Sequence, residues 1–136
     1  MKKLGIVLLA VVAFSAFTGP AFAGAFGDLK MKATDARESL VAMLKNKDKR
    51  GPDQQKLVKD TADAVSAALG KLKAPAGKEA QFKELSDNWN AFKKTREEEL
   101  VPAILAGKQE EADKIATGIQ RERLKKVFDM CDELDK

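Results

Sequence analysis

The feature that most constrains the fold is the wide spacing of turn signals after residue 24. Three are clear, each with a glycine, at residues 49–52, 74–77 and 106–108. The stretches between them are rich in Ala, Leu, Lys, Glu and Gln, which favour helix over strand. The sequence therefore predicts four helices, at roughly 28–47, 53–73, 78–105 and 109–135.

Each predicted helix carries an apolar stripe, in which apolar residues recur at steps of three and four. In the first two segments the stripes are Leu29, Ala33, Ala36, Leu40 and Met43, and Leu57, Thr61, Ala64, Ala68 and Leu72. In the last two they are Phe82, Leu85, Trp89 and Phe92, and Ala112, Ile115, Ile119, Val127, Met130 and Leu134. Narrow apolar stripes are buried when the helices pack around one shared core. Short connections make consecutive helices antiparallel neighbours. We expect an all-α fold, an up-down-up-down antiparallel four-helix bundle, formed by a single domain over residues 24–136.

The first 23 residues have the pattern of a cleavable signal peptide. Two lysines precede an apolar run over residues 4–17, and residues 21–23 read Ala-Phe-Ala, the A-x-A pattern of a cleavage site. The run is about 14 residues long, shorter than the ~20 that a membrane-spanning helix needs. We therefore expect residues 1–23 to be removed before Gly24 and the protein to be periplasmic. The alternative is a retained membrane anchor.

Charge balance and the lack of histidine exclude several classes of function. Removing the signal takes away two of the 25 basic residues and leaves 21 acidic ones, so the mature chain is almost neutral. Such a chain is not expected to bind nucleic acid. Without histidine there are no ligands for c-type haem or for a Glu-x-x-His di-iron site, and zinc would have only carboxylates and one thiol. Paired acid–base groups for catalysis are also lacking. We expect no metal, no cofactor and no enzymatic activity.

The stretch from Glu98 to Ala112 forms a corner between the third and fourth predicted helices. Pro102 removes a backbone donor from the last turn of the third helix, so we expect that helix to kink or loosen near residues 95–99. Gly107 supplies a left-handed residue that ends it. The corner is either only the tip of a helical hairpin or part of a site.

Two arginines interrupt the apolar stripes. Arg96 continues the stripe of the third helix and Arg123 that of the fourth. Counted from the corner at ~1.5 Å per residue, Arg37, Arg96 and Gln120 fall in one layer of the bundle, with Arg123 a turn below. One interpretation is internal pairing with Glu38 and Asp63, acidic residues of the same layer. The other is a pocket for a small anionic ligand, with Trp89 as an aromatic wall. The candidate ligand-binding residues are Arg37, Trp89, Arg96, Gln120 and Arg123.

Several of these residues belong to a longer pattern, made up of Trp89-x-x-Phe92, Arg96, Leu100–Lys108, Glu111-Ala112 and Gly118-Ile119-Gln120-x-Glu122-Arg123. The pattern resembles the second half of the four-helix-bundle periplasmic sensor domain of bacterial methyl-accepting chemotaxis receptors and some sensor kinases. The likeness is best over residues 82–134. It implies a bundle that dimerises through its first and fourth helices and binds a small solute between helices. It assigns no particular ligand-contact residue.

The sequence departs from that family at both ends, which bears on the function. The family has two transmembrane segments, whereas here we expect a cleaved signal and no second span, so this chain alone would not signal across a membrane. We expect an exported, stand-alone sensor-like protein that binds a small solute, anionic if the arginines face it, or docks on a membrane-bound receptor or kinase. The alternative is a ligand-free periplasmic bundle with a structural, adaptor or chaperone-like role.

Cys131 is the single cysteine of the chain and cannot form an internal disulfide. It lies beside Met130, one step from the stripe of the fourth helix. We expect a homodimer in which Cys131 is a dimer contact, close enough to its mate for oxidation to cross-link the two. The alternative is a buried, inert thiol in a monomer.

Overall fold

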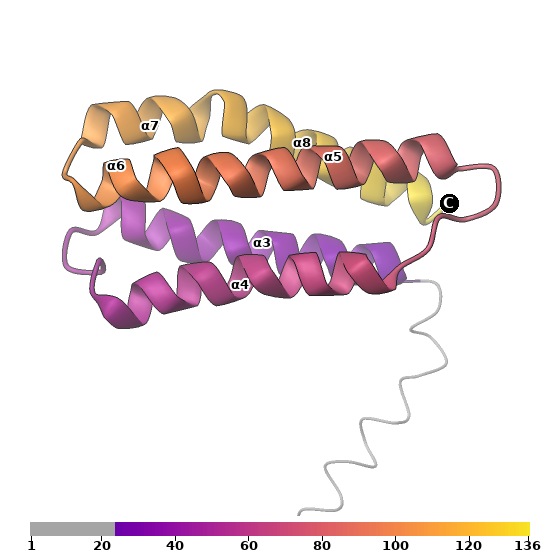
Figure 1. Ribbon diagram of the computed structural model, residues 1–136, viewed down its shortest axis with the longest axis horizontal. Coiled ribbons are helices and arrows are strands. Elements are labelled where there is room, and N and C mark those ends of the chain that lie inside the picture. The colour runs from indigo at the N-terminus through magenta and orange to yellow at the C-terminus, as the bar shows by residue number, and fades with distance from the viewer. Residues whose placement is uncertain (1–23) are drawn as a thin grey trace, which may run out of the picture.

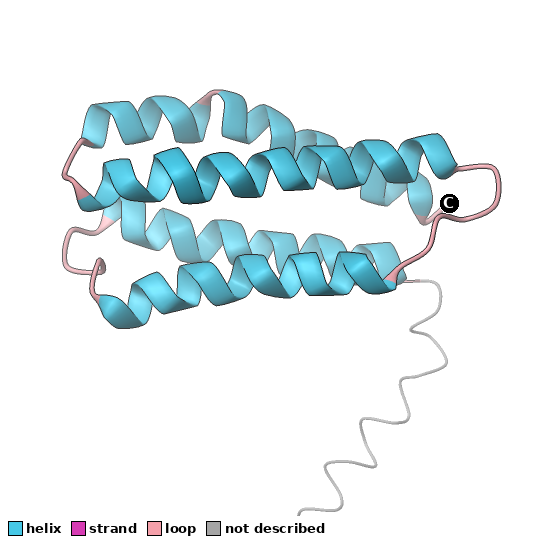
Figure 2. Ribbon diagram, in the orientation of Figure 1, coloured by secondary structure: helices cyan, strands magenta, loops and turns pink. Residues whose placement is uncertain are grey.

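A computed structural model describes residues 24–136, and the predicted signal peptide lies outside the described residues (Figure 1). This part of the chain contains helices and loops but no strand, as predicted (Figure 2). The first two helical stretches are α3 (Ala25–Lys45) and α4 (Pro52–Lys71). The third comprises α5 (Glu79–Thr95), the π-helical turn η1 (Arg96–Leu100) and α6 (Val101–Leu105). The fourth comprises α7 (Gln109–Thr117) and α8 (Ile119–Leu134). None of the helices in residues 24–136 is long and apolar enough to cross a membrane.

The four stretches lie side by side as two closely packed pairs, α3 with α4 and α5 with α8 (Figure 1). The pairs meet along α3 and α8, which run in opposite directions, because Phe26 at the start of α3 lies beside Asp135 at the end of α8. The Phe26 amide donates to the Asp135 carboxylate at 3.2 Å, and Lys30 pairs with Asp132 at 3.0 Å.

The buried faces follow the predicted stripes on the first and third stretches but not on the second. All five stripe residues of α3 are buried, as are Leu85, Trp89 and Phe92 of α5. On α4 the prediction is wrong by one position: Leu57 is 47% exposed, and the buried residues are Val58, Ala62, Val65 and Leu69. The two sets share one period and lie side by side on the helix, so the spacing alone does not choose between them.

The loosening predicted before Pro102 is confirmed as the π-helical turn η1. The amide of Val101 bonds to the carbonyl of Arg96, five residues back instead of four. Pro102 has no amide hydrogen, and its ring would clash with the carbonyl of Glu98 in a regular helix. The wider turn relieves that conflict. Gly107, with φ of 78°, then ends α6 with bonds from Gly107 to Ile104 and from Lys108 to Ala103.

The fourth stretch is not the single helix predicted over 109–135, because it breaks at Gly118 between α7 and α8 (Figure 2). A Cβ at this position would lie 2.8 Å from the backbone carbonyl oxygen of Lys114, closer than real Cβ contacts allow. Only glycine fits there without a shift of the backbone. The break also alters the buried face: Ile119 is exposed, and Leu124 and Cys131 are buried in α8.

Candidate functional site

A cleft of about 420 Å³ lies between α3 and the α7–α8 stretch, and buried residues of α5 and η1 form its floor. The helix α3 contributes Arg37, Leu40, Val41, Leu44 and Lys45. The floor contributes Phe92, Arg96 and Leu100, and α7–α8 contributes Ala116, Thr117, Gln120, Arg121, Leu124, Lys125 and Phe128. The break at Gly118 falls within this last wall, so it shapes the cleft. Three of the five candidate residues, Arg37, Arg96 and Gln120, line this one cleft.

The lining of the cleft is cationic and apolar. Five of its residues are basic and none is acidic: Arg37, Lys45, Arg96, Arg121 and Lys125. Lys125 pairs with Asp129 at 2.9 Å, but that carboxylate lies one turn further along α8 and outside the lining. Positive charge on walls of low polarity attracts anions more strongly than the same charge on an open surface.

Arg96 is the most unusual residue of the site, because its side chain is 1% exposed and has no carboxylate partner among residues 24–136. Its guanidinium donates to the carbonyl of Ala36 on α3 at 2.9 Å and to that of Val58 on α4 at 2.7 Å. Its Nε–H has no acceptor. Burial lowers the pKa of Arg96 to about 10, against a smaller opposing effect of the nearby Glu97 charge.

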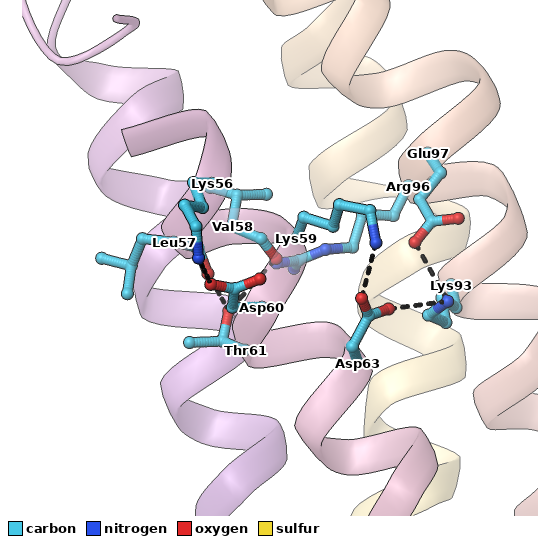
Figure 3. Close-up of polar contacts among 10 residues, drawn as sticks. All are labelled: Lys56, Leu57, Val58, Lys59, Asp60, Thr61, Asp63, Lys93, Arg96 and Glu97. Atoms are coloured by element: carbon cyan, nitrogen blue, oxygen red, sulfur yellow. Dashed lines mark hydrogen bonds and ion pairs between the residues drawn. The ribbon is translucent and has the colours of Figure 1, made fainter. Parts of the chain in front are cut away.

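The internal pairing considered for the arginines is wrong. Asp63 is bonded instead by Lys59 at 2.6 Å and by Lys93 at 3.2 Å (Figure 3). Hydrogen bonds from these two lysines hold the pKa of Asp63 below its usual value. Within residues 24–136, Glu38 forms no ion pair with either arginine. Arg96 crosses from η1 toward α4 and reaches backbone oxygen, not an acid (Figure 3).

Gln120 and Arg123 form a second polar group that ties α8 to α5. Gln120 is buried and donates to the carbonyl of Phe92 at 2.9 Å, while its own oxygen accepts from Arg123 at 3.4 Å. Arg123 also donates to the Thr95 hydroxyl at 2.6 Å and to the Ala91 carbonyl at 3.1 Å. Arg123 is thus held against α5 and does not line the cleft.

Trp89 belongs to the core and not to the wall of the cleft. Its side chain is 1% exposed, and its indole N–H donates to the hydroxyl of Ser66 on α4 at 3.0 Å. The aromatic residues of the lining are Phe92, whose ring centroid lies 5.3 Å from that of Trp89, and Phe128. Trp89 therefore packs in the core against Phe92, which forms part of the floor of the cleft.

The sequence prediction named three of the fifteen lining residues, and those it missed include Lys45, Arg121, Lys125 and Phe128. Three of these four lie on the fourth stretch, where Thr117, Arg121, Lys125 and Phe128 recur at steps of three and four next to the buried stripe. Basic residues in such positions usually mark a solvated face. They border a cleft here because α3 lies beside them.

Cys131 is completely buried among the core residues of the monomer, which corrects its assignment as a dimer contact. Burial, with a smaller effect of Asp132, raises the pKa of the thiol to about 12. A protonated thiol without solvent access neither cross-links nor binds a metal. In the part of the chain that is described, no group of three or more His, Cys, Asp or Glu residues could hold a metal ion.

Comparison with protein-family models, with curated proteins and with solved structures found no match for this chain.

Proposed function

We propose that this protein is an exported, stand-alone, sensor-like bundle that binds a small anionic solute in the cleft between α3 and α8. One observation carries the proposal: in the described part of the chain, Arg96 is buried without an acidic partner on the floor of a cleft whose lining has four more cations and no carboxylate. A buried charge without a counter-charge destabilises a fold unless it serves another purpose. An anion in the cleft would supply the missing counter-charge.

The resemblance to chemoreceptor sensor domains supports the same proposal. The pattern from Trp89 to Arg123 contains the two helix irregularities, η1 and the break at Gly118, that frame the cleft. In this proposal the four stretches form an up-down-up-down antiparallel bundle, the protein is a periplasmic homodimer, and it acts without cofactor, metal, nucleic acid or catalysis. Its macromolecular partner would be a membrane-bound receptor or sensor kinase.

A ligand-free structural or adaptor bundle is the second candidate, and one observation favours it. Arg96 joins η1 to α3 and to α4 through its two bonds to backbone carbonyls, so it also links the two helix pairs. A purely structural arginine would need no solute.

A thermal-shift screen separates the two candidates. Carboxylates, amino acids and inorganic anions are compared at equal ionic strength, with the Arg37→Gln variant as the test of the site. A ligand at a hundred times its Kd adds ~2.7 kcal/mol to the free energy of unfolding, so a binding anion raises Tm clearly. The rise should shrink in Arg37→Gln. If no anion raises Tm, the structural candidate is preferred.

Export is tested separately by sequencing the N-terminus of protein recovered from the periplasm. We expect the chain to start at Gly24. A start at Met1 would contradict the proposed localisation.

A further inference from the structure

We infer that the solute is an amphipathic carboxylate, a single anionic head on an apolar body, such as a short-chain fatty acid or an arylcarboxylate. This inference rests on the proposed function and names the class of ligand for the same cleft. It follows from the uneven distribution of charge and apolar surface over the lining.

The accessible basic groups lie at the rim of the cleft. Arg37, Arg121 and Lys125 are exposed, whereas Arg96 and Gln120 are closed off at the floor. The contacts of Phe26 with Asp135 and of Lys30 with Asp132 fix the register of α3 against α8. Seven residues further along, Arg37 of α3 stands opposite residue 125 of α8, because both helices rise equally per residue. An anionic head therefore meets cations from both sides of the mouth.

Below the rim the lining is apolar. It contains Leu40 and Val41 of α3, Leu124 and Phe128 of α8, and Phe92 of α5. Val41 and Phe128 are half-buried, so they still offer surface to a ligand. The ring of Phe128 is held by Lys30, whose ammonium lies 5.5 Å from the ring centroid. A small polar anion such as citrate or phosphate would leave this surface uncovered, whereas an apolar body would cover it.

Arg96 acts on such a ligand through its charge and not through contact. Its guanidinium bonds to the carbonyls of Ala36 and Val58, and its side chain is sealed from solvent. Its charge, which has no ion-pair partner within residues 24–136, still raises the potential of the whole cleft. The volume of about 420 Å³ also fits a free small molecule, since pockets for such ligands span roughly 300–1,000 Å³.

Calorimetric titration of the purified protein tests whether the ligand is an amphipathic carboxylate. The ligands are acetate, butyrate, hexanoate and octanoate below its micelle concentration, with citrate as a polar anion. Hexanol and hexylammonium have the same apolar body without the negative charge. We expect Kd to fall about fourfold for each methylene that the cleft buries. We expect hexanol and hexylammonium to bind at least about tenfold more weakly than hexanoate, since they leave the rim cations unpaired or repel them.

Matched variants localise the binding. Lys125 and Lys83 are both exposed lysines paired with an aspartate four residues later, but only Lys125 lines the cleft. Arg121→Gln combined with Lys125→Gln should weaken hexanoate about tenfold, and Lys83→Gln should leave its Kd unchanged. Val41→Thr keeps the shape of the wall and should reduce the gain per methylene.

The outcomes separate this inference from the proposed function. One outcome is that citrate or acetate binds as tightly as octanoate, with the Arg121→Gln and Lys125→Gln substitutions weakening the polar anion and octanoate equally. That result would support an anion site but show that the ligand is not an amphipathic carboxylate. If no anion binds at all, the proposed function fails. Binding to anionic vesicles but not to dissolved octanoate would overturn the inference in favour of a lipid surface.

Discussion

At the scale of single residues, Arg96 is a buried charge that lowers the stability of the folded protein. Its pKa in the folded protein is about 10, below the ordinary 12.5. A base whose pKa is lowered by folding destabilises the folded state at every pH below that folded pKa, here on the order of 3 kcal/mol. One of its two acceptors, the Ala36 carbonyl, also accepts from the Ser39 hydroxyl at 2.9 Å. The other, the Val58 carbonyl, lies 3.2 Å from the Thr61 hydroxyl, which also reaches the Leu57 carbonyl at 2.8 Å and can turn its single proton to either.

We therefore expect Arg96→Met to raise the free energy of unfolding by about 1–2 kcal/mol while weakening anion binding. Urea denaturation and the titration above measure the two effects. Arg50→Met is the contrasting variant. Arg50 donates to the last carbonyls of two helices, at Met43, Leu44 and Ile104, and its loss should cost about 2 kcal/mol. A loss of stability of similar size in Arg96→Met would show that Arg96 is a structural link.

The second prediction at this scale concerns Cys131. Because the thiol is fully buried and its pKa is about 12, we expect a thiol reagent to modify it only when the protein unfolds. Labelling should be slow in buffer at pH 8 and complete in denaturant, and oxidant should give no cross-linked band on a non-reducing gel. Rapid labelling of the native protein would mean that the C-terminal end of α8 opens.

At the scale of helices, Gly118 is the position where the backbone leaves no room for a side chain. Gly118→Ala would force its Cβ against the Lys114 carbonyl oxygen, 2.8 Å away, so we expect a loss of about 1–3 kcal/mol. Gly70 provides the matched control, because it lies in α4 and a Cβ added there would have no atom within 4 Å. Gly70→Ala should stabilise by about 0.5 kcal/mol. Equal effects of the two substitutions in chemical denaturation would contradict a constraint at Gly118.

The two irregular helices also show what a sequence can and cannot predict. The π turn before Pro102 was predictable, because the missing amide and the ring act on neighbours within the same helix. The break at Gly118 was not predictable, because a glycine is tolerated inside helices and nothing local requires the chain to bend there. The stripe of α4 was missed for a related reason: two overlapping stripes fit its sequence, and only packing against α3 selects one.

The same limit applies to the site. Counting the rise per residue placed Arg37, Arg96 and Gln120 in one layer, and they do line one cleft. The direction in which each side chain points around its helix axis was harder to predict. Arg123 is three residues from Gln120, so it is rotated by about 60° and reaches α5 instead of the cleft. Trp89 lies in the core because its large ring gains from burial, and Ser66 on α4 accepts the bond of its indole N–H there.

At the scale of the whole molecule, the cleft bears on self-association. The resemblance implies a homodimer that uses the first and fourth helices, which correspond to α3 and α7–α8. A two-fold axis along that face would bring the rim cations of one copy, among them Arg37, Arg121 and Lys125, toward those of its mate. Like charges that face each other weaken association, and salt screens the repulsion, with a Debye length of ~10 Å at 0.1 M.

We therefore expect light scattering to give a mass that rises toward the dimer as salt increases from low to physiological concentration. Saturation with hexanoate should have the same effect at low salt, because bound carboxylates neutralise the rim. Arg121→Gln combined with Lys125→Gln should dimerise without added salt, while Lys83→Gln, outside the cleft lining, should behave as the parent does. A monomer mass under all of these conditions would rule out the dimer. Salt screens attraction between opposite charges as well as repulsion between like charges. A dimer that dissociates as salt rises would therefore be held by oppositely charged surfaces. Its contact would not be the cationic face formed by α3 and α8.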